Sequence, residues 1–236
     1  ADRAVSEDPL ERRAVEDGFP TSVSWGFEVA AQTGSAVLVD ATDFFLRDAY
    51  GVIAALRRSN QGTWRLDAIR SAAYLPRTKG FPRNTEVEVT LTFTSDQPGA
   101  LVTTVTPTPE VLTLRQHHSV VELPAQPMKM RRSEPRAGYH GITFMDYATP
   151  LGEPLQKQYI ARHRIEKRNP GALRSEPVEP IVYYLDPGTP EPVRSALLQG
   201  ARWWNEAFEA AGFIDGFRVE VLPPDADPMD ARYNMI

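Results

Sequence analysis

The sequence predicts an α+β fold, in which a strand-rich, mostly antiparallel domain with one clear helix precedes a shorter stretch of alternating strand and helix. Two observations support this. Apolar and polar residues alternate strictly over 85–95, as in a strand with one buried face. From residue 181 an apolar strand, an amphipathic helix and a second strand follow one another, which is typical of an α/β unit. We therefore expect two domains, over 1–175 and 176–236.

Composition narrows the class of protein. The chain has 236 residues, a net charge of −5 and no cysteine. The lack of cysteine excludes disulfides, thiolate metal sites and cysteine nucleophiles. A mildly acidic chain is a poor electrostatic match for nucleic acid or an anionic membrane. No apolar run approaches the roughly 20 residues of a membrane helix. We expect neither a nucleic-acid partner nor a membrane span.

The first elements are a lead-in, a hairpin and a helix. Residues 1–20 form a weakly structured or helical lead-in that ends at Gly18-Phe19-Pro20. Two strands, 24–31 and 35–40, flank a Gln-Thr-Gly turn. Residues 41–60 predict the clear helix, because apolar residues recur there at helical spacing after a cap at Thr42 or Asp43. A glycine inside this pattern, Gly51, weakens the helix.

Antiparallel strands follow. The alternation over 85–95 places apolar side chains on one face and glutamates and threonines on the other, which predicts a half-buried strand. Shorter patterns predict further strands around 101–106, 111–123, 139–145 and 157–167.

The predicted secondary structure changes from antiparallel strands to alternating strand and helix after the proline-rich stretch 169–180, which we take as the domain boundary. An apolar strand covers 181–186. A helix over 190–211 follows, with a Thr189-Pro190 start and a stop at Gly212. Its apolar stripe includes Trp204, which we expect in the core, whereas Trp203 is a boundary position.

Two more strand patterns close the sequence. Residues 217–222 predict a strand, and 231–236 the first half of another. A half-strand would leave an unpaired edge, so we expect 176–236 to be an incomplete domain that docks onto the strand-rich domain or pairs between chains.

The four histidines give no metal or catalytic motif. They are His117, His118, His140 and His163, and none is followed by glutamate, so the chain lacks H-E-x-x-H. His117 and His118 are adjacent in a predicted strand and point to opposite faces, as do His163 and Glu166. Hydrogen-bonded or interface roles are favoured for them. We assign no catalytic, cofactor-binding or metal-ligating residue.

Several separated segments nevertheless resemble one family. They are 114–124, 134–141 and 161–213, together with 40–48, 65–74 and 80–93. In this order they are similar to large exported bacterial zinc-dependent metallopeptidases, in which an uncharacterised strand-rich domain precedes a metzincin-like peptidase domain. On this resemblance 181–186 is the first strand of the peptidase domain, 190–211 its first long helix, and 217–222 and 231–236 its next strands.

The resemblance implies a function for the parent protein. In the family, zinc is held by a later H-E-x-x-H-x-x-G-x-x-H motif whose glutamate activates the bound water. No residue here matches it, so no ligand or base is carried over. We expect the N-terminal part of a periplasmic or extracellular zinc metallopeptidase. Alone it would be inactive and free of zinc, with the rest of the peptidase domain as its partner and a protein or peptide as the parent's substrate.

Two alternatives stay open. The first is that the chain is a non-enzymatic module, which either binds a protein or glycan or acts on the peptidase as an inhibitory pro-segment. A weaker alternative is a hydrolase with a carboxylate or histidine site of its own, which would have to use His163, Glu166 or the His117/His118 pair.

Overall fold

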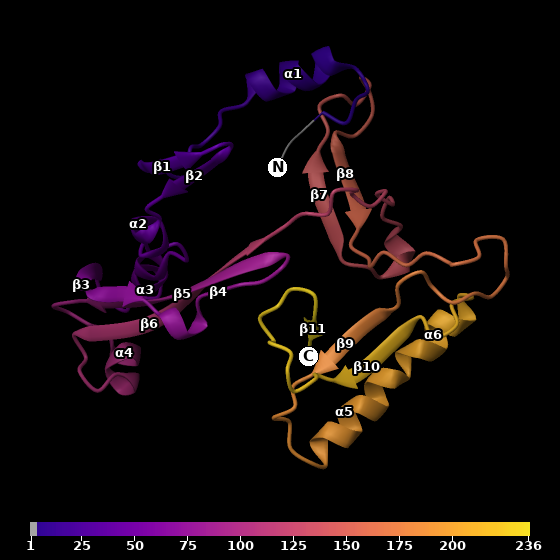
Figure 1. The fold of residues 1–236 in the computed structure, drawn as a ribbon. Coiled ribbons are helices and arrows are strands. Elements are labelled where there is room, and N and C mark those ends of the chain that lie inside the picture. The colour runs from indigo at the N-terminus through magenta and orange to yellow at the C-terminus, as the bar shows by residue number, and fades with distance from the viewer. Residues whose placement is uncertain (1–3) are drawn as a thin grey trace. The chain divides into compact units, whose positions relative to one another are not determined.

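The computed structural model describes residues 4–236 and has the expected α+β fold. The chain divides into two compact units (Figure 1). The long-sheet unit contains 24–123 and 223–234, and the parallel-sheet unit contains the N-terminal residues to Val23, 124–222 and 235–236. The expected boundary between domains 1–175 and 176–236 stays a prediction.

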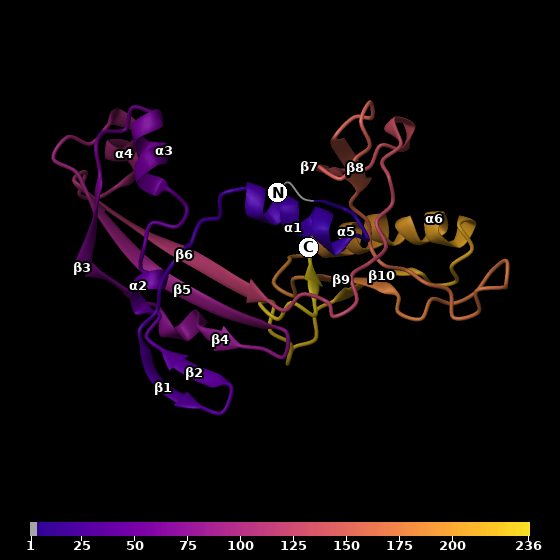
Figure 2. The ribbon, with the colours of Figure 1, turned by 90° about the horizontal axis from the view of Figure 1, so that it is seen from above.

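The long-sheet unit is built on strand β5 (Asn84–Thr94). One edge of β5 pairs along its whole length with β6 (Val111–Val121), from Asn84 opposite Val121 to Thr94 opposite Val111. The other edge is shared by β3 (Arg65–Ala73) and the short β4 (Lys79–Gly80). A 3₁₀ turn, η1 (Leu75–Arg77), joins β3 to β4. All pairings are antiparallel, as the alternation in the sequence indicates (Figure 2).

One face of β5 forms the hydrophobic core of this unit. Val89, Leu91 and Phe93 are almost completely buried, together with Trp64 and Val102. The Trp64 indole donates a hydrogen bond of 2.7 Å to the carbonyl oxygen of Gln61, so its polar atom is satisfied inside the core. Three short helices contribute to the packing: α2 (Thr42–Phe45), α3 (Val52–Arg58) and α4 (Ala100–Val105).

The single helix expected over 41–60 is wrong, because the chain breaks it into α2 and α3. Helix α2 ends at Phe45, and Gly51, directly before α3, has a φ of +68° in the left-handed region. The Asp48 carboxylate accepts hydrogen bonds from the amides of Val52 (2.7 Å) and Ile53 (2.9 Å), which satisfies the start of α3. Asp48 therefore takes the capping role that the sequence suggested for Thr42 or Asp43.

The strand expected around 101–106 is also wrong. This stretch is helix α4, which follows Gly99. The side-chain oxygen of Gln61 accepts hydrogen bonds from the amides of Leu101 (2.9 Å) and Val102 (3.3 Å), so a residue from a distant segment caps the helix. A short apolar run fits either structure, and here this tertiary cap decides for the helix.

The first hairpin is shorter than expected. Strands β1 (Val29–Thr33) and β2 (Ala36–Val39) pair antiparallel around Gly34, as the turn signal predicts. Residues 24–28 lie outside β1. Instead the rings of Trp25 and Phe27 lie 6.0 and 5.5 Å from the ring of Phe44, which draws this segment toward α2.

The parallel-sheet unit begins with helix α1 (Pro9–Gly18), which confirms a helical lead-in. The Asp8 carboxylate caps it by accepting a 2.8 Å hydrogen bond from the Leu10 amide. Strands β7 (Gly141–Met145) and β8 (Gln156–Ile160) form an antiparallel hairpin after the 3₁₀ turn η2 (Pro135–Ala137). Strand β8 ends at Ile160, so the expected strand to residue 167 is too long.

A three-stranded sheet with a helical crossover completes this unit. Strands β9 (Ile181–Leu185) and β10 (Phe217–Val221) are parallel, and α5 (Val193–Arg202) and α6 (Trp204–Ala210) connect them. Strand β11 (Asn234–Met235) lies on the other side of β9, giving the order β10-β9-β11. The expected sequence of strand, helix, strand and third strand is confirmed.

The single helix expected over 190–211 is divided at Trp203 into α5 and α6, and two further details differ from the expectation. It begins at Val193 rather than 190, with the Glu191 carboxylate accepting a 3.2 Å hydrogen bond from the Ser195 amide. Trp204 is 65% exposed, so its expected place in the core is wrong. Asn205 and Phe208 face β10 instead: the Phe208 ring stacks on Phe217 at 5.6 Å, and the Asn205 side chain accepts from the Phe217 amide.

Alanine substitutions test whether Phe93 of β5 lies in the core of the long-sheet unit and Ile69 of β3 outside it. Replacing Phe93 with alanine is expected to lower the free energy of unfolding by about 3–5 kcal/mol, because it removes a fully buried ring and leaves a cavity. Replacing Ile69, which is 98% exposed, with alanine is expected to change it by about 0.5 kcal/mol or less. Chemical denaturation measures both, and equal effects would contradict the assignment.

Candidate functional site

The second face of β5 carries the densest group of ionisable side chains in the long-sheet unit. Asn84, Glu86 and Glu88 alternate with the core residues of the strand, and on β6 Ser119 and His117 stand directly opposite the two glutamates. Glu86 and Glu88 are only 3% and 6% exposed. The expectation of a half-buried strand with a solvated polar face is therefore wrong at this end of β5.

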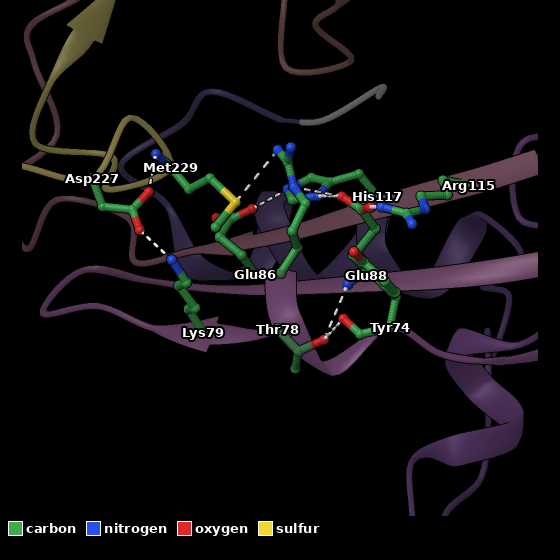
Figure 3. Close-up of polar contacts among 10 residues, drawn as sticks. Tyr74, Thr78, Lys79, Glu86, Glu88, Arg115, His117, Asp227 and Met229 are labelled. Atoms are coloured by element: carbon green, nitrogen blue, oxygen red, sulfur yellow. Dashed lines mark hydrogen bonds and ion pairs between the residues drawn. The ribbon is translucent and has the colours of Figure 1, made fainter.

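Glu86 is hydrogen-bonded through both carboxylate oxygens. Its Oε1 accepts from Asn84 Nδ2 (2.5 Å) and Ser119 Oγ (2.7 Å). Its Oε2 lies 2.5 Å from His117 Nε2 (Figure 3). Burial raises the pKa of Glu86, but the hydrogen bonds from Ser119, Asn84 and His117 outweigh it. The net result is a pKa below the ordinary value for glutamate, so the ionised form is favoured.

Glu88 is paired with two arginines. Arg77 Nε lies 2.9 Å from its Oε2, and Arg115 Nη1 lies 3.2 Å from its Oε1 (Figure 3). The Arg115 guanidinium also stacks on the Tyr74 ring at 3.4 Å, which holds it over the strand. These contacts supply the opposite charge that a buried carboxylate needs.

His117 bridges the two glutamates. Its Nε2 faces Glu86, and its Nδ1 lies 3.5 Å from Glu88 Oε2. Nε2 is hydrogen-bonded to Glu86 and Nδ1 faces the Glu88 carboxylate, so a carboxylate lies beside each ring nitrogen. Because the carboxylates sit at opposite nitrogens of the ring, the three side chains do not converge on one point as metal ligands would.

The zinc implied by the resemblance does not fit these residues. Within residues 4–236, no group of three or more histidine, aspartate or glutamate side chains is arranged to hold a metal ion. We therefore derive no step through zinc from this chain. In the same part of the chain, no helix is long and apolar enough to cross a membrane.

His118 and His163 have contacts of their own. His118 points to the opposite face of β6 from His117, as the strand pattern predicts, and packs against Phe45 with ring centroids 5.2 Å apart. Burial is the main cause that lowers its pKa. His163 Nε2 lies 3.0 Å from the hydroxyl of Tyr183, and its segment follows the end of β8.

A distant segment closes the polar face. We call residues 223–234 the connector, because they join β10 to β11. Asn84 Nδ2 donates to the Met229 carbonyl oxygen (2.8 Å), and Asn84 Oδ1 accepts from the Ala231 amide (3.0 Å). Lys79 Nζ lies 2.6 Å from Asp227 Oδ2 (Figure 3). A shallow open pocket remains beside these contacts, lined in part by Arg77, Lys79, Asp227 and Met229.

We call Asn84, Glu86, Glu88, Arg77, Arg115, His117 and Ser119 the β5 polar cluster. Sequence analysis did not single it out. The one available signal was two glutamates alternating with valines in a strand, which is the ordinary pattern of a solvated face. The connector offers no motif that would place it against them.

Comparison with known proteins gives one result for this chain. A family model described as "Domain of unknown function (DUF5117)" matches residues 1–168. No curated protein and no solved structure matches the chain. The matched region includes β5 and β6 with the whole β5 polar cluster, and it ends before β9 and the connector.

The lowered pKa of Glu86 predicts how stability depends on pH. Because the folded-state pKa lies below the unfolded one, ionised Glu86 stabilises the fold above the ordinary value of 4.5, and this is lost as pH falls further. We expect Glu86→Gln to lower the free energy of unfolding by roughly 1–3 kcal/mol at pH 7. The gap to wild type should shrink as the pH falls below the ordinary glutamate value of 4.5.

Denaturant titrations at a series of pH values measure this gap. Glu134→Gln is the control, since Glu134 is paired with Arg136 on the surface and exposed pairs contribute little. No measurable loss of stability is expected for it at neutral pH. A gap between wild type and Glu86→Gln that stays constant down to pH 3 would show that the charge of Glu86 does not stabilise the fold.

Proposed function

The chain belongs to the DUF5117 family, and we propose that it is the non-catalytic N-terminal part of a zinc-dependent metallopeptidase. On this proposal residues 1–175 support, orient or shield the peptidase domain, and 176–236 provide its first strands and helices. The zinc ligands and the catalytic glutamate belong to the rest of the parent protein. The proposal includes a periplasmic or extracellular location and a protein or peptide substrate for the parent.

One observation supports the proposal most. Directly after the matched region, β9, the α5–α6 crossover and β10 form a parallel unit, and β11 adds a third strand. Parallel strands joined by a helical crossover are the start of an α/β domain, distinct in kind from the antiparallel sheet before it. This is the order of elements that the resemblance expects for the beginning of the peptidase domain.

The β5 polar cluster supports the non-catalytic part of the proposal. His117 contacts carboxylates through both nitrogens, and the oxygens of Glu86 and Glu88 are each paired. A general base needs a free lone pair within reach of a substrate proton. The geometry of this cluster favours holding the sheet and connector together over proton transfer.

The proposal predicts where zinc and activity reside. The purified chain should contain well below about one zinc per molecule and should not cleave peptides, because it lacks the ligand set. The product of its gene, read in frame past Ile236, should contain H-E-x-x-H, bind about one zinc per chain and cleave peptides. Replacing that motif's glutamate with glutamine should abolish cleavage and leave the zinc in place.

Metal analysis and a peptide-cleavage assay on the two proteins test this. Absence of the motif downstream, or one tightly bound zinc in the 236-residue chain, would contradict the proposal. Adding the chain to the separately produced downstream part of the parent protein distinguishes an inhibitory role of the chain from a supporting one. Inhibition indicates a pro-segment, activation or stabilisation indicates a supporting domain, and no effect contradicts a direct role on the peptidase.

A further inference from the structure

The connector is the place where the chain leaves one unit and returns to it. Residues 223–234 belong to the long-sheet unit, whereas β10 before them and residues 235–236 after them belong to the parallel-sheet unit. A connection between two consecutive strands usually runs as a short loop beside its own sheet. Here twelve residues are instead held by side chains of β4 and β5.

The Asn84 amide is the centre of this attachment. It is 4% exposed, and each of its polar atoms is used. Its Nδ2 donates to Glu86 Oε1 and to the Met229 carbonyl oxygen, and its Oδ1 accepts from the Ala231 amide. One side chain thus contacts an acceptor and a donor on the connector backbone, two residues apart. An asparagine can bind an extended peptide in this way without reading its side chains.

Glu86 fixes which way the amide points. An ionised carboxylate only accepts hydrogen bonds, so the NH₂ group of Asn84 has to face Glu86. The Asn84 oxygen is then directed to the Ala231 amide, as observed. Rotating the amide by 180° would set oxygen against oxygen at Glu86 and hydrogen against hydrogen at Ala231. Glu86 is thus a positioning residue for Asn84.

A charge pair adds a second attachment point. Lys79 on β4 is paired with Asp227, and the Asp227 carboxylate also accepts a 3.0 Å hydrogen bond from the Met229 amide. The hydrogen bond from Lys79 is the main cause that lowers the pKa of Asp227. Asp227 thus holds the Met229 amide, while Asn84 binds the carbonyl oxygen of the same residue.

We propose that the polar face of β4 and β5 is a docking site whose occupant is the connector 223–234, with Asn84 binding the connector backbone and Glu86 setting the orientation of Asn84. The site lies within the DUF5117 region, and its occupant lies outside it. The inference rests on contacts within this chain and does not depend on the presence of zinc or of a peptidase.

Hydrogen exchange of the native chain tests the docking. The Ala231 amide donates to Asn84 and reports directly on it. Asn84→Ala should speed exchange in peptides covering 229–232 by about tenfold or more, while peptides over 89–94 keep their protection. Ser119→Ala is the matched control, because it removes a donor from Glu86 without touching the connector. It should change exchange at 229–232 by less than about twofold.

Glu86 variants test the positioning role. Glu86→Ala should speed exchange at 229–232, and Glu86→Gln, which keeps an acceptor for Asn84, should restore much of the protection. A role in sheet stability alone would move exchange across β5 and β6 and would not single out the connector. Unchanged exchange at 229–232 in Asn84→Ala would overturn the docking site, and equal effects of Glu86→Ala and Ser119→Ala would overturn the positioning role.

Lys79→Ala is a second test of the docking site, needed if Asn84→Ala unfolds the sheet, because Lys79 contacts Asp227 of the connector. Lys79 is a partly exposed residue on a short edge strand, so its loss should leave the sheet intact. Faster exchange confined to 225–229 supports the docking site. Unchanged exchange there, with the sheet unfolded in Asn84→Ala, would show that Asn84 is a folding residue and would overturn the proposal.

Discussion

The pairing of the Glu86 and Glu88 carboxylates with neighbouring cations and donors is the interaction on which the long-sheet unit depends. Strand β5 is buried on both faces, yet one of those faces carries two carboxylates. Taking an unpaired carboxylate out of water costs several kcal/mol, which is a large share of the stability of a small unit. Arg77, Arg115 and His117 remove this penalty and let β4, η1 and the connector cover the face.

The two faces of β5 therefore stabilise the unit by different interactions. The apolar face, with Val89, Leu91 and Phe93, stabilises the unit by hydrophobic burial, which is non-directional and tolerates small shifts. The polar face binds through hydrogen bonds of fixed geometry, so it selects one arrangement of the segments that cover it. This difference explains how a segment more than a hundred residues away in the chain is held at a defined place on the sheet.

Local patterns allowed much of the fold to be predicted. Period-two alternation gave β5 and β6, and the order of strand, helix and strand after residue 180 gave the parallel unit, because both signals are contained in a few neighbouring residues. The errors share one cause. Gln61 caps helix α4, Asp48 caps α3, and the connector covers the polar face of β5. Contacts of this kind produce no periodic pattern in the sequence.

The candidate site could not be predicted from the sequence, because it also depends on contacts between separate segments. Glutamates that alternate with valines are normally solvated, and only the register of β6 and the path of η1 show that these two are buried. Trp204 shows the converse, since it lies on an apolar stripe and is exposed. The family match places the cluster in the DUF5117 region but assigns it no role, so its chemistry is argued from geometry alone.

The most direct test of this account is a double-mutant cycle between Glu86 and His117, measured by chemical denaturation at pH 6. Glu86→Ala, His117→Ala and the double variant are compared with the wild-type chain. If the contact between Glu86 and His117 helps to close the polar face of β5, the losses in unfolding free energy should be non-additive, with a coupling of about 1–2 kcal/mol. Additive losses, within about 0.5 kcal/mol, would contradict the central role given to this pairing.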